Sequence, residues 1–515
     1  MNGAESLIRT LVGAGVDVCF ANPGTSEMHL VQAIDGVEEM RGVLCLFEGV
    51  CTGAADGYAR LTGRPAVTLL HLGPGLGNGI ANLHNARRAS TPLINLIGNH
   101  ALYHVEFDAP LTSDIDTLAK NVSSWIKSDS TATSLSTDAM QALRSSLHAK
   151  PGSAGQISTM IIPADACWSE ASNIASQLNA PSRETVASQQ IDQVAATIDS
   201  QSLILLDKQG LELAGRFSAA RVAKKLGCRV AMSTFPARVD GGPGTPVIER
   251  LPYFPEHVLA SLEGVSQIIL AGAEPPVSFF AYPETASLLV PKGCQVIDLA
   301  KGHEDVVNAL SQLESLLGAS EIAPDCYQYE PLELPQGALT TMNVARILAA
   351  KMPANSIFCG DSGGGGAVFE PAQRSASHIW LNLTGGSIGQ GGPVAIGAAI
   401  AAPEAQVFAL LGDGASMYTN QAFWTQARES LNVTTVIFNN QRYGILETEY
   451  KRLGVNEIGD RAGSLFSLSG PEIDFVSLAG SMGVPGCRAD SCESFSAALS
   501  RSLEQSGPYL IEAMV

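Results

Sequence analysis

The chain has 515 residues, of which 45% are hydrophobic and 16% charged, and its formal net charge at pH 7 is −19. Its length exceeds what one hydrophobic core holds and predicts about three domains. The acidic balance argues against nucleic acid or an anionic membrane surface as a partner, since both require a basic face. The N-terminal residues show no secretory signal, and the longest apolar stretch, 391–403, is too short to span a bilayer.

The ten cysteines are scattered through the chain, and none forms a CxxC pair. This distribution predicts free thiols in a reducing cytoplasm and gives no indication of a zinc site. The 51 glycines are typical of tight turns and close helix packing in a folded α/β protein. Composition therefore predicts a cytoplasmic, folded protein.

The first third of the chain alternates predicted strands with helices. A helix over residues 4–12 comes first. The predicted strands span residues 16–21, 43–47, 66–71 and 93–98. This order predicts a doubly wound parallel sheet, in which chemistry lies at the carboxyl ends of the strands. Thr25, Glu48 and His71 follow three of those ends and are the first candidate site residues.

Two similar units follow, separated by linkers at about 166–190 and 323–337. The middle unit has predicted strands at residues 203–206, 229–232, 268–271 and 295–299. The last unit opens with a predicted helix, 341–350, and a strand, 356–359. We expect an α/β protein of three consecutive doubly wound parallel-sheet domains, spanning residues 1–165, 190–322 and 337–515.

The most informative stretch runs from Gly412 to Asn440. An apolar strand ends at Gly412-Asp413-Gly414, a helix-compatible segment follows, and a second apolar strand leads into Asn439-Asn440. Glycines let backbone N–H groups approach a phosphate, and oxygens at the ends of two adjacent strands can share one hard cation. Gly-Asp-Gly alone also occurs in ordinary turns, but the whole pattern predicts a magnesium-bridged diphosphate.

Together with other stretches, this motif resembles the thiamine-diphosphate-dependent decarboxylase and acetolactate synthase superfamily. The matching stretches are NPGTSE (22–27), FEGVCTGAADGYARLTGRPA (47–66), residues 71–85, TGGSIGQGGPVAIGAA (384–399) and residues 412–444. The resemblance covers essentially the whole chain, in the order pyrimidine-binding, middle and diphosphate-binding domain, and is closest to benzoylformate decarboxylase and acetolactate-synthase-like proteins. It implies a 2-oxo acid decarboxylase that releases an aldehyde or ligates the enamine to a second carbonyl.

The resemblance gives Glu48 the central catalytic role. In the family, a carboxyl group at this position hydrogen-bonds N1′ of the aminopyrimidine and favours the imino tautomer, whose 4′ nitrogen removes the thiazolium C2 proton. Without the adjoining Asp56-Gly57-Tyr58-Ala59 signature, Glu48 would be interpreted as an exposed acid at a helix N-terminus.

A second motif is expected to fold the cofactor. By resemblance, the backbone carbonyl of Gly386 accepts from the 4′-amino group, and Ile388 is the bulky aliphatic residue between the two rings. The residue type alone leaves Ile388 equally compatible with an ordinary core position.

The resemblance also implies a magnesium site and a diphosphate cradle. Magnesium is expected to bind Asp413, the Asn440 side chain and the main-chain carbonyl of Arg442, which leaves the Arg442 guanidinium free. The other groups expected to hold the diphosphate belong to Ser362, Gly363, Gly412, Gly414, Ala415, Ser416, Tyr443 and Gly444.

His71 and Thr25 match the substrate-binding histidine and serine of benzoylformate decarboxylase. A histidine can relay a proton and a hydroxyl can donate to a carboxylate, although His71 also fits a capped strand end and Thr25 a turn hydroxyl. His100 and His104 follow the fourth predicted strand and are further candidates.

The middle domain departs from the resemblance. Residues 275–282, PPVSFFAY, contain no histidine where benzoylformate decarboxylase has its second active-site histidine, which favours ligation over simple decarboxylation. Phe279, Phe280 and Tyr282 either line an apolar substrate wall or pack in the core. Residues 445–465 are expected to cover the site.

The expected cofactors are thiamine diphosphate and Mg²⁺, without FAD, because no Arg/Asp-rich flavin segment lies between residues 207 and 300. Family members place Glu48 of one chain against the diphosphate domain of another, so a homodimer or homotetramer is expected. The expected substrates are a small 2-oxo acid and an aldehyde or ketone acceptor. A flavin-dependent oxidase of the same fold and a non-catalytic nucleotide-binding protein are the alternatives; an intact Glu48 argues against the second.

Overall fold

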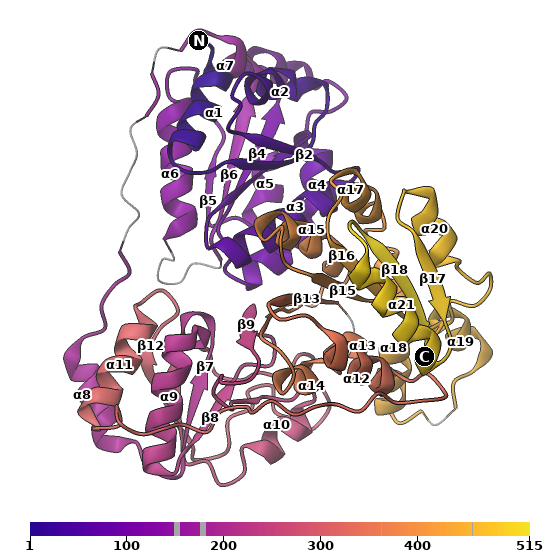
Figure 1. Cartoon of the computed structure of the whole chain (residues 1–515). Helices are drawn as coiled ribbons and strands as arrows, with labels where there is room; N and C mark the ends of the chain where they lie inside the picture. Colours follow the sequence, from indigo (N-terminus) through magenta and orange to yellow (C-terminus); the bar gives the residue numbers. More distant parts are fainter. Residues whose placement is uncertain (149–154, 172, 176–181, 362, 456) are drawn as a thin grey trace. The chain divides into compact units, whose positions relative to one another are not determined.

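The computed structural model describes residues 1–148, 155–171, 173–175, 182–361, 363–455 and 457–515. They form two compact units, whose elements are labelled in Figure 1. The first unit combines Met1–Leu147 and Ala154–Asn179 with Pro331–Val515, and the second contains Ala180–Glu330. The first unit carries two parallel sheets and the second carries one, which confirms the predicted fold class.

The N-terminal sheet of the first unit has the strand order β2-β1-β3-β4-β6-β5, and its pairings are parallel. Its strands are β1 (Val18–Asn22), β2 (Arg41–Leu44), β3 (Ala66–Leu70), β4 (Leu93–Asn99), β5 (Trp125–Lys127) and β6 (Ile157–Pro163). The accompanying helices are α1 (Gly3–Gly13), η1 (Thr25–Glu27), α2 (Met28–Asp35), α3 (Glu48–Thr62), α4 (Leu72–Arg88), η2 (Leu102–Phe107), α5 (Ile115–Lys120), α6 (Leu135–Leu147) and α7 (Ala164–Trp168). The central strands are buried apolar runs, as expected for a sheet covered on both faces.

The C-terminal sheet of the same unit includes six strands in the order β17-β18-β16-β15-β13-β14, also paired in parallel. Its strands are β13 (Ser356–Asp361), β14 (His378–Leu381), β15 (Val407–Gly412), β16 (Val433–Asn439), β17 (Gly486–Ala489) and β18 (Tyr509–Met514). Its helices are α12 (Thr341–Lys351), α13 (Gly363–Gly366), α14 (Phe369–Gln373), α15 (Gly391–Ala401), α16 (Asp413–Ser416), α17 (Ala422–Arg428), α18 (Gly444–Arg452), α19 (Asp460–Phe466), α20 (Phe475–Ser481) and α21 (Cys492–Glu504).

Helices α3 and α15 pack against each other between these two sheets and lie side by side in Figure 1. Glycines make this close crossing possible. A methyl group at Gly53 would lie 2.5 Å from the Pro393 side chain, and one at Gly397 would overlap the carbonyl oxygen of Ala54. The crossing fixes the start of α3, where Glu48 lies, relative to the loop that precedes α15.

The second unit has one five-stranded parallel sheet, in the order β10-β8-β7-β11-β12. Its elements are α8 (Ser188–Thr197), β7 (Ser202–Leu206), η3 (Lys208–Leu211), α9 (Leu213–Leu226), β8 (Arg229–Met232), β9 (Arg238–Gly241), β10 (Glu249–Arg250), α10 (Pro255–Ser261), β11 (Gln267–Ala271), β12 (Gln295–Ala300) and α11 (Val306–Leu316). Phe279 and Phe280 are 40% and 53% exposed, so core packing is wrong for these two rings.

Three local predictions need correction. The strand predicted over 43–47 ends at Leu44, because Phe47 is the N-cap of α3 and its carbonyl accepts from the N–H groups of Val50 and Cys51. The linker predicted over 166–190 is partly helical, since α7 reaches Trp168 and α8 begins at Ser188. The single helix predicted after Gly414 is two short helices, α16 and α17.

No helix of the described chain combines the length and the apolar character needed to cross a lipid bilayer.

Candidate active site

Two clusters of candidate residues lie at the carboxyl ends of adjacent strands. In the N-terminal sheet, β1 pairs with both β2 and β3, so the segments that follow these strands meet at one edge. Those segments carry Thr25, Glu48 and His71. A methyl group at Gly75 would lie 3.2 Å from Glu48 Oε1 and 3.4 Å from His71 Cβ, so these two side chains flank the same glycine.

Glu48 is the first residue of α3 and is only 5% exposed, which contradicts its interpretation as an exposed acid. Its Oε2 accepts a hydrogen bond of 2.9 Å from the side-chain amide of Asn78 on α4. A buried carboxyl group needs such partners, because water no longer solvates it.

His71 forms a close pair with Glu27, a residue that the sequence did not single out. His71 Nδ1 lies 2.8 Å from Oε2 of Glu27, whose side chain is completely buried. The Glu27 carboxylate also accepts from the Gly24 N–H group and the Ser26 hydroxyl, both at 2.8 Å. Because a carboxylate only accepts, the proton of the neutral imidazole belongs on Nδ1, which leaves Nε2 to accept a proton.

Thr25 lies on the exposed side of the same turn. It begins η1, and its hydroxyl makes no hydrogen bond within the described residues. Ser26 is the hydroxyl residue that approaches His71, with Oγ 3.2 Å from Nδ1. The role predicted for Thr25 stays a prediction, since the turn leaves its hydroxyl free for a ligand.

The second cluster lies in the C-terminal sheet. Strand β15 pairs with β13 and β16, and Gly412 lies opposite Phe438, so the ends of all three strands are neighbours. Asp413 follows β15 and Asn440 follows β16, as the metal prediction requires.

Asp413 has the properties of an incomplete cation site. Its Oδ1 accepts from the Gly414 N–H group at 2.7 Å, while its Oδ2 is buried without a partner among the described residues. Burial raises the pKa of Asp413, although N–H groups of Gly414, Gln441, Arg442 and Asn440 oppose the shift. A divalent cation would remove this cost of burial by giving the carboxylate a charged partner.

The residues around Asp413 are those predicted for the cofactor cradle. Gly414 needs to be glycine because the Tyr443 ring occupies the space of its side chain. A methyl group at Gly444 would lie 3.4 Å from Asn440 Nδ2. Asn440 Oδ1 accepts from the N–H group of Arg442 at 3.1 Å, which shapes the turn between them.

Two details of this cluster differ from, or lie outside, the prediction. The Arg442 guanidinium is not free, because Nη1 lies 3.6 Å from Glu447 on α18. Gly363 begins α13 and is exposed, whereas Ser362 lies outside the described residues.

Gly386 and Ile388 lie in the loop before α15. Gly386 has a positive φ of 76° and is exposed, and Ile388 is half-buried, so Ile388 is not an ordinary core residue. The Gly386 carbonyl has no hydrogen bond within the described chain, while its neighbours in the loop are held by side chains of α4.

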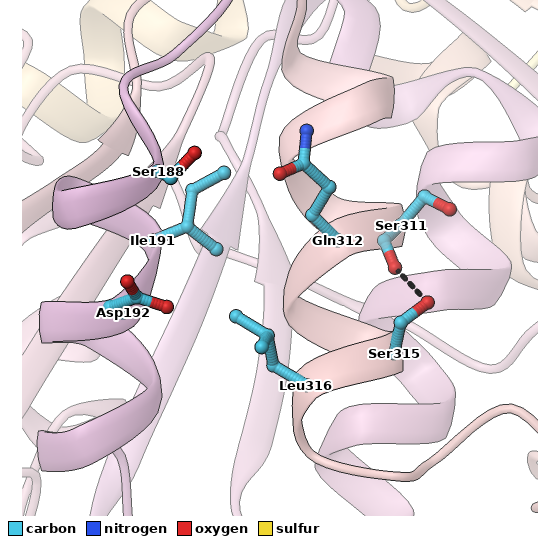
Figure 2. A pocket seen from close by; sticks show the side chains of 7 residues that line it. All are labelled: Ser188, Ile191, Asp192, Ser311, Gln312, Ser315 and Leu316. Carbon is cyan, nitrogen blue, oxygen red and sulfur yellow. Dashed lines mark hydrogen bonds between the residues drawn. The ribbon is translucent and has the colours of Figure 1, made fainter.

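His100 and His104 follow β4, the neighbour of β3, and a methyl group at Gly98 near the end of β4 would overlap the Glu27 carboxylate. His100 packs against His104, which packs against Phe107, with ring centroids 5.4 and 5.9 Å apart; their catalytic role stays a prediction. Figure 2 shows an open groove in the second unit between α8 and α11, with Asp192 as its single titratable side chain. It holds no pair of groups suited to acid–base or nucleophilic chemistry.

The sequence contained a signal for several residues that were missed. Asn78, Asn82 and Asn85 follow one another at helical spacing and therefore share one face of α4. Asn82 and Asn85 are buried, and a buried amide must find hydrogen-bond partners. Likewise, Glu27 follows Gly24 at the spacing of a capping box, which places its carboxylate back against the start of the turn.

Two family models match the N-terminal and the C-terminal part of the chain. Residues 1–120 match the family model of the thiamine pyrophosphate enzyme N-terminal TPP binding domain, and residues 359–513 match the model of the C-terminal TPP binding domain. The chain is 46% identical to “Putative acetolactate synthase large subunit IlvX” of Mycobacterium tuberculosis, over 100% of this chain and 99% of the relative. It is 27% identical to benzoylformate decarboxylase of Pseudomonas aeruginosa, over 97% and 96% of the two chains.

A solved structure has the same fold. The thiamine diphosphate-dependent 4-hydroxybenzoylformate decarboxylase of Rhodococcus jostii RHA1 aligns with a TM-score of 0.86 over 100% of this chain and 99% of its own, at 24% identity. Neither a flavin-dependent oxidase nor a non-catalytic nucleotide-binding protein gains support from these comparisons.

Proposed function

We propose that this chain, which belongs to the thiamine pyrophosphate enzyme family, decarboxylates a 2-oxo acid without oxidation and then releases an aldehyde or ligates it to a second carbonyl compound. The observation that carries the proposal is the buried carboxyl group of Glu48, with the His71–Glu27 pair at the same sheet edge. A protein that only bound the cofactor would not need these groups.

The residues present fit a magnesium-bound diphosphate. The partnerless Oδ2 of Asp413 supports a cation here, with Asn440 Oδ1 and the Arg442 carbonyl as further hard oxygen ligands. In the first turn of α16, the Gly414 N–H group donates to the Asp413 side chain, while those of Ala415 and Ser416 have no carbonyl partner within the helix. We propose that the turn from Gly414 to Ser416 faces the phosphate oxygens. Gly363, Tyr443 and Gly444 are proposed to complete the cradle, with Gly412 allowing the strand to approach it. Without the cofactor, the Tyr443 N–H group donates to the Phe466 carbonyl at 2.8 Å and the Gly444 N–H group to the Arg442 carbonyl at 3.1 Å, so both would have to exchange partners.

When bound, the cofactor would supply a nucleophilic thiazolium carbon and a cationic ring that serves as the electron sink for decarboxylation. Glu48 would hydrogen-bond N1′ of the pyrimidine. The Gly386 carbonyl would accept from the 4′-amino group, and Ile388 would support the folded arrangement of the two rings.

His71 is proposed to transfer protons to and from the substrate. Glu27 fixes the imidazole through Nδ1, so Nε2 is the atom that accepts or returns a proton. Thr25 is proposed to donate from its exposed hydroxyl to the substrate carboxylate, and α18 with α19 is proposed to exclude water.

The proposal also covers the cellular compartment, the oligomeric state and the absence of FAD. All ten cysteines are free, which supports a reducing cytoplasm. We propose a homodimer or homotetramer, in which Glu48 serves the cofactor held by a second chain, and no FAD. A yellow protein with stoichiometric flavin absorbance, or a monomer with full turnover, would contradict these statements.

The names of two relatives suggest the class of the donor substrate. The relative of Mycobacterium tuberculosis is named as a putative acetolactate synthase, and that of Pseudomonas aeruginosa as a benzoylformate decarboxylase. The proposed donor is therefore a 2-oxo acid with a short aliphatic or an aryl group. Screening pyruvate, branched 2-oxo acids and benzoylformate for carbon dioxide release, with product masses, distinguishes release from ligation.

The decisive experiment is Glu48→Gln in the holoenzyme. Glutamine preserves the shape but cannot supply the carboxyl proton, so turnover should fall by about 10²-fold or more while cofactor and magnesium remain bound. Glu38→Gln, at an exposed position of the same domain, is the matched control and should retain full turnover. Near-normal turnover of Glu48→Gln would remove the proposed role.

A further inference from the structure

The loop before α15 is held by side chains at almost every residue. The Thr384 hydroxyl donates to the Asn85 carbonyl at 2.7 Å, and the Gly385 carbonyl lies 3.1 Å from His84 Nε2. Four residues after Gly385, the Gly389 N–H group donates to Asp361 at 2.8 Å. These polar contacts restrain the loop, because each of the bonded groups would lose a partner if the loop moved.

Asn85 makes the most specific of these contacts. Its Oδ1 accepts from the N–H group of Ser387 at 3.2 Å, and its Nδ2 donates to the carbonyl of the same residue at 2.8 Å. The side-chain amide of Asn85 therefore pairs with the backbone N–H and C=O groups of Ser387, as a residue on a neighbouring strand would. Ser387 lies between Gly386 and Ile388, so this contact fixes the orientation of both.

Asn82 extends the same contact toward Glu48. Its Oδ1 accepts from Asn85 Nδ2 at 3.2 Å, and its Nδ2 donates to the Gly49 carbonyl at 2.8 Å and more weakly to the Gly389 carbonyl at 3.4 Å. Gly49 is the residue after Glu48. One buried amide thus joins the start of α3 to the loop.

The opposite side of the loop is held from the C-terminal sheet. The Thr419 hydroxyl, between α16 and α17, donates to the Gly389 carbonyl at 2.7 Å. Asp361 accepts from Gly391 at 2.9 Å in addition to Gly389. The loop is therefore fixed from two sides, while the Gly386 carbonyl keeps its hydrogen-bonding capacity and Ile388 stays half-buried.

We infer that Asn82 and Asn85 are positioning residues that preset this loop for the cofactor. The inference rests on the proposed function: the loop presents the Gly386 carbonyl and Ile388 in the geometry that holds the two cofactor rings together. Both asparagines act through the loop and touch no reacting atom. The diphosphate end is anchored separately, around Asp413, so loss of the asparagine contacts should impair ring geometry more than binding.

The test compares Asn85→Ala and Asn82→Ala with Asn95→Ala. Asn95 is an equally buried asparagine of the same domain, but it bonds with Thr68 and Thr159 inside the sheet. Each protein is loaded with thiamine diphosphate and Mg²⁺. Proton–deuteron exchange at the cofactor C2 atom is then followed by quenching and NMR, cofactor affinity by titration of the apo form, and folding by urea unfolding.

We expect C2 exchange to slow by about 10- to 100-fold in Asn85→Ala and less in Asn82→Ala, whose contact with the loop is longer. Cofactor affinity should change little in either variant. Asn95→Ala should lose stability but keep the parental exchange rate.

Equal exchange rates in all three variants would overturn the inference, and so would slowing in Asn95→Ala as large as in Asn85→Ala. Should Asn85→Ala fail to fold, Asn85→Asp provides the same test, since it keeps the acceptor for Ser387 N–H but not the donor to its carbonyl. A parent chain that binds no thiamine diphosphate would refute the proposed function itself, which separates the two failures.

Discussion

Replacing Asp361 tests whether a buried, protonated carboxyl group holds the loop before α15. The residue ends β13, and its Oδ2 accepts from Gly389 and Gly391, while its Oδ1 is buried without a partner among the described residues. Burial raises the pKa of Asp361 to about 7, against the opposing effect of the N–H groups of Gly391, Gly389 and Gln390. We predict that Asp361 carries a proton in the folded, cofactor-free protein below that pH.

This proton makes the free energy of unfolding depend on pH. Below the ordinary value of 3.8, the carboxyl group is protonated in both states, and its contribution to stability is complete. Between 3.8 and about 7, the unfolded chain loses the proton while the folded chain keeps it, so stability falls as the pH rises. At about 1.4 kcal/mol for each unit, three units correspond to a loss on the order of 4 kcal/mol.

The measurement compares the parent protein with Asp361→Asn in urea unfolding at a series of pH values from 4 to 8. The other groups titrate alike in both proteins, so the difference between the two free energies isolates residue 361. We expect the parent to lose stability relative to the variant up to about pH 7, and the difference to stay level above it. An infrared band of a protonated carboxyl group, absent from the variant, would support the same assignment. A difference that does not vary with pH would refute the reasoning.

Three further substitutions test the fold and the site. Gly397→Ala should lower the free energy of unfolding by roughly 1–3 kcal/mol, because the methyl group would overlap the backbone of α3. The control, Gly77→Ala, places its methyl group in open space on α4 and should not lower it. Equal urea midpoints for the two variants would contradict the helix crossing. Glu27→Gln should slow turnover by about 10²-fold at unchanged cofactor affinity, since His71 loses its carboxylate partner; an unaltered rate would leave the pair a structural role only. Asp413→Ala should abolish magnesium-dependent retention of the cofactor on gel filtration, and full retention would argue against the proposed metal site.

The arrangement of elements could largely be predicted from the sequence, because apolar runs that end at glycine or polar residues mark the strand ends. Parallel pairing then brings such ends to one edge, which is why Asp413 and Asn440, 27 positions apart, could be placed together in advance. Strands β6 and β18 were missed, although both are apolar and buried. A short apolar run without a following motif does not reveal by periodicity alone whether it is strand or helix.

The polar contacts of the site could not be predicted, because they depend on tertiary geometry rather than on residue type. In the turn after β1, Thr25 and Ser26 offer the same hydroxyl group, and the backbone of η1 decides that Ser26 approaches His71. Asn85 and Ser387 are 302 positions apart, and nothing local to either predicts their pairing. What the sequence did contain was a stripe of asparagines on one face of α4. Because a buried amide must be satisfied, that stripe predicts that a polar backbone segment lies against the helix, and only the structure identifies it as the loop that carries Gly386 and Ile388.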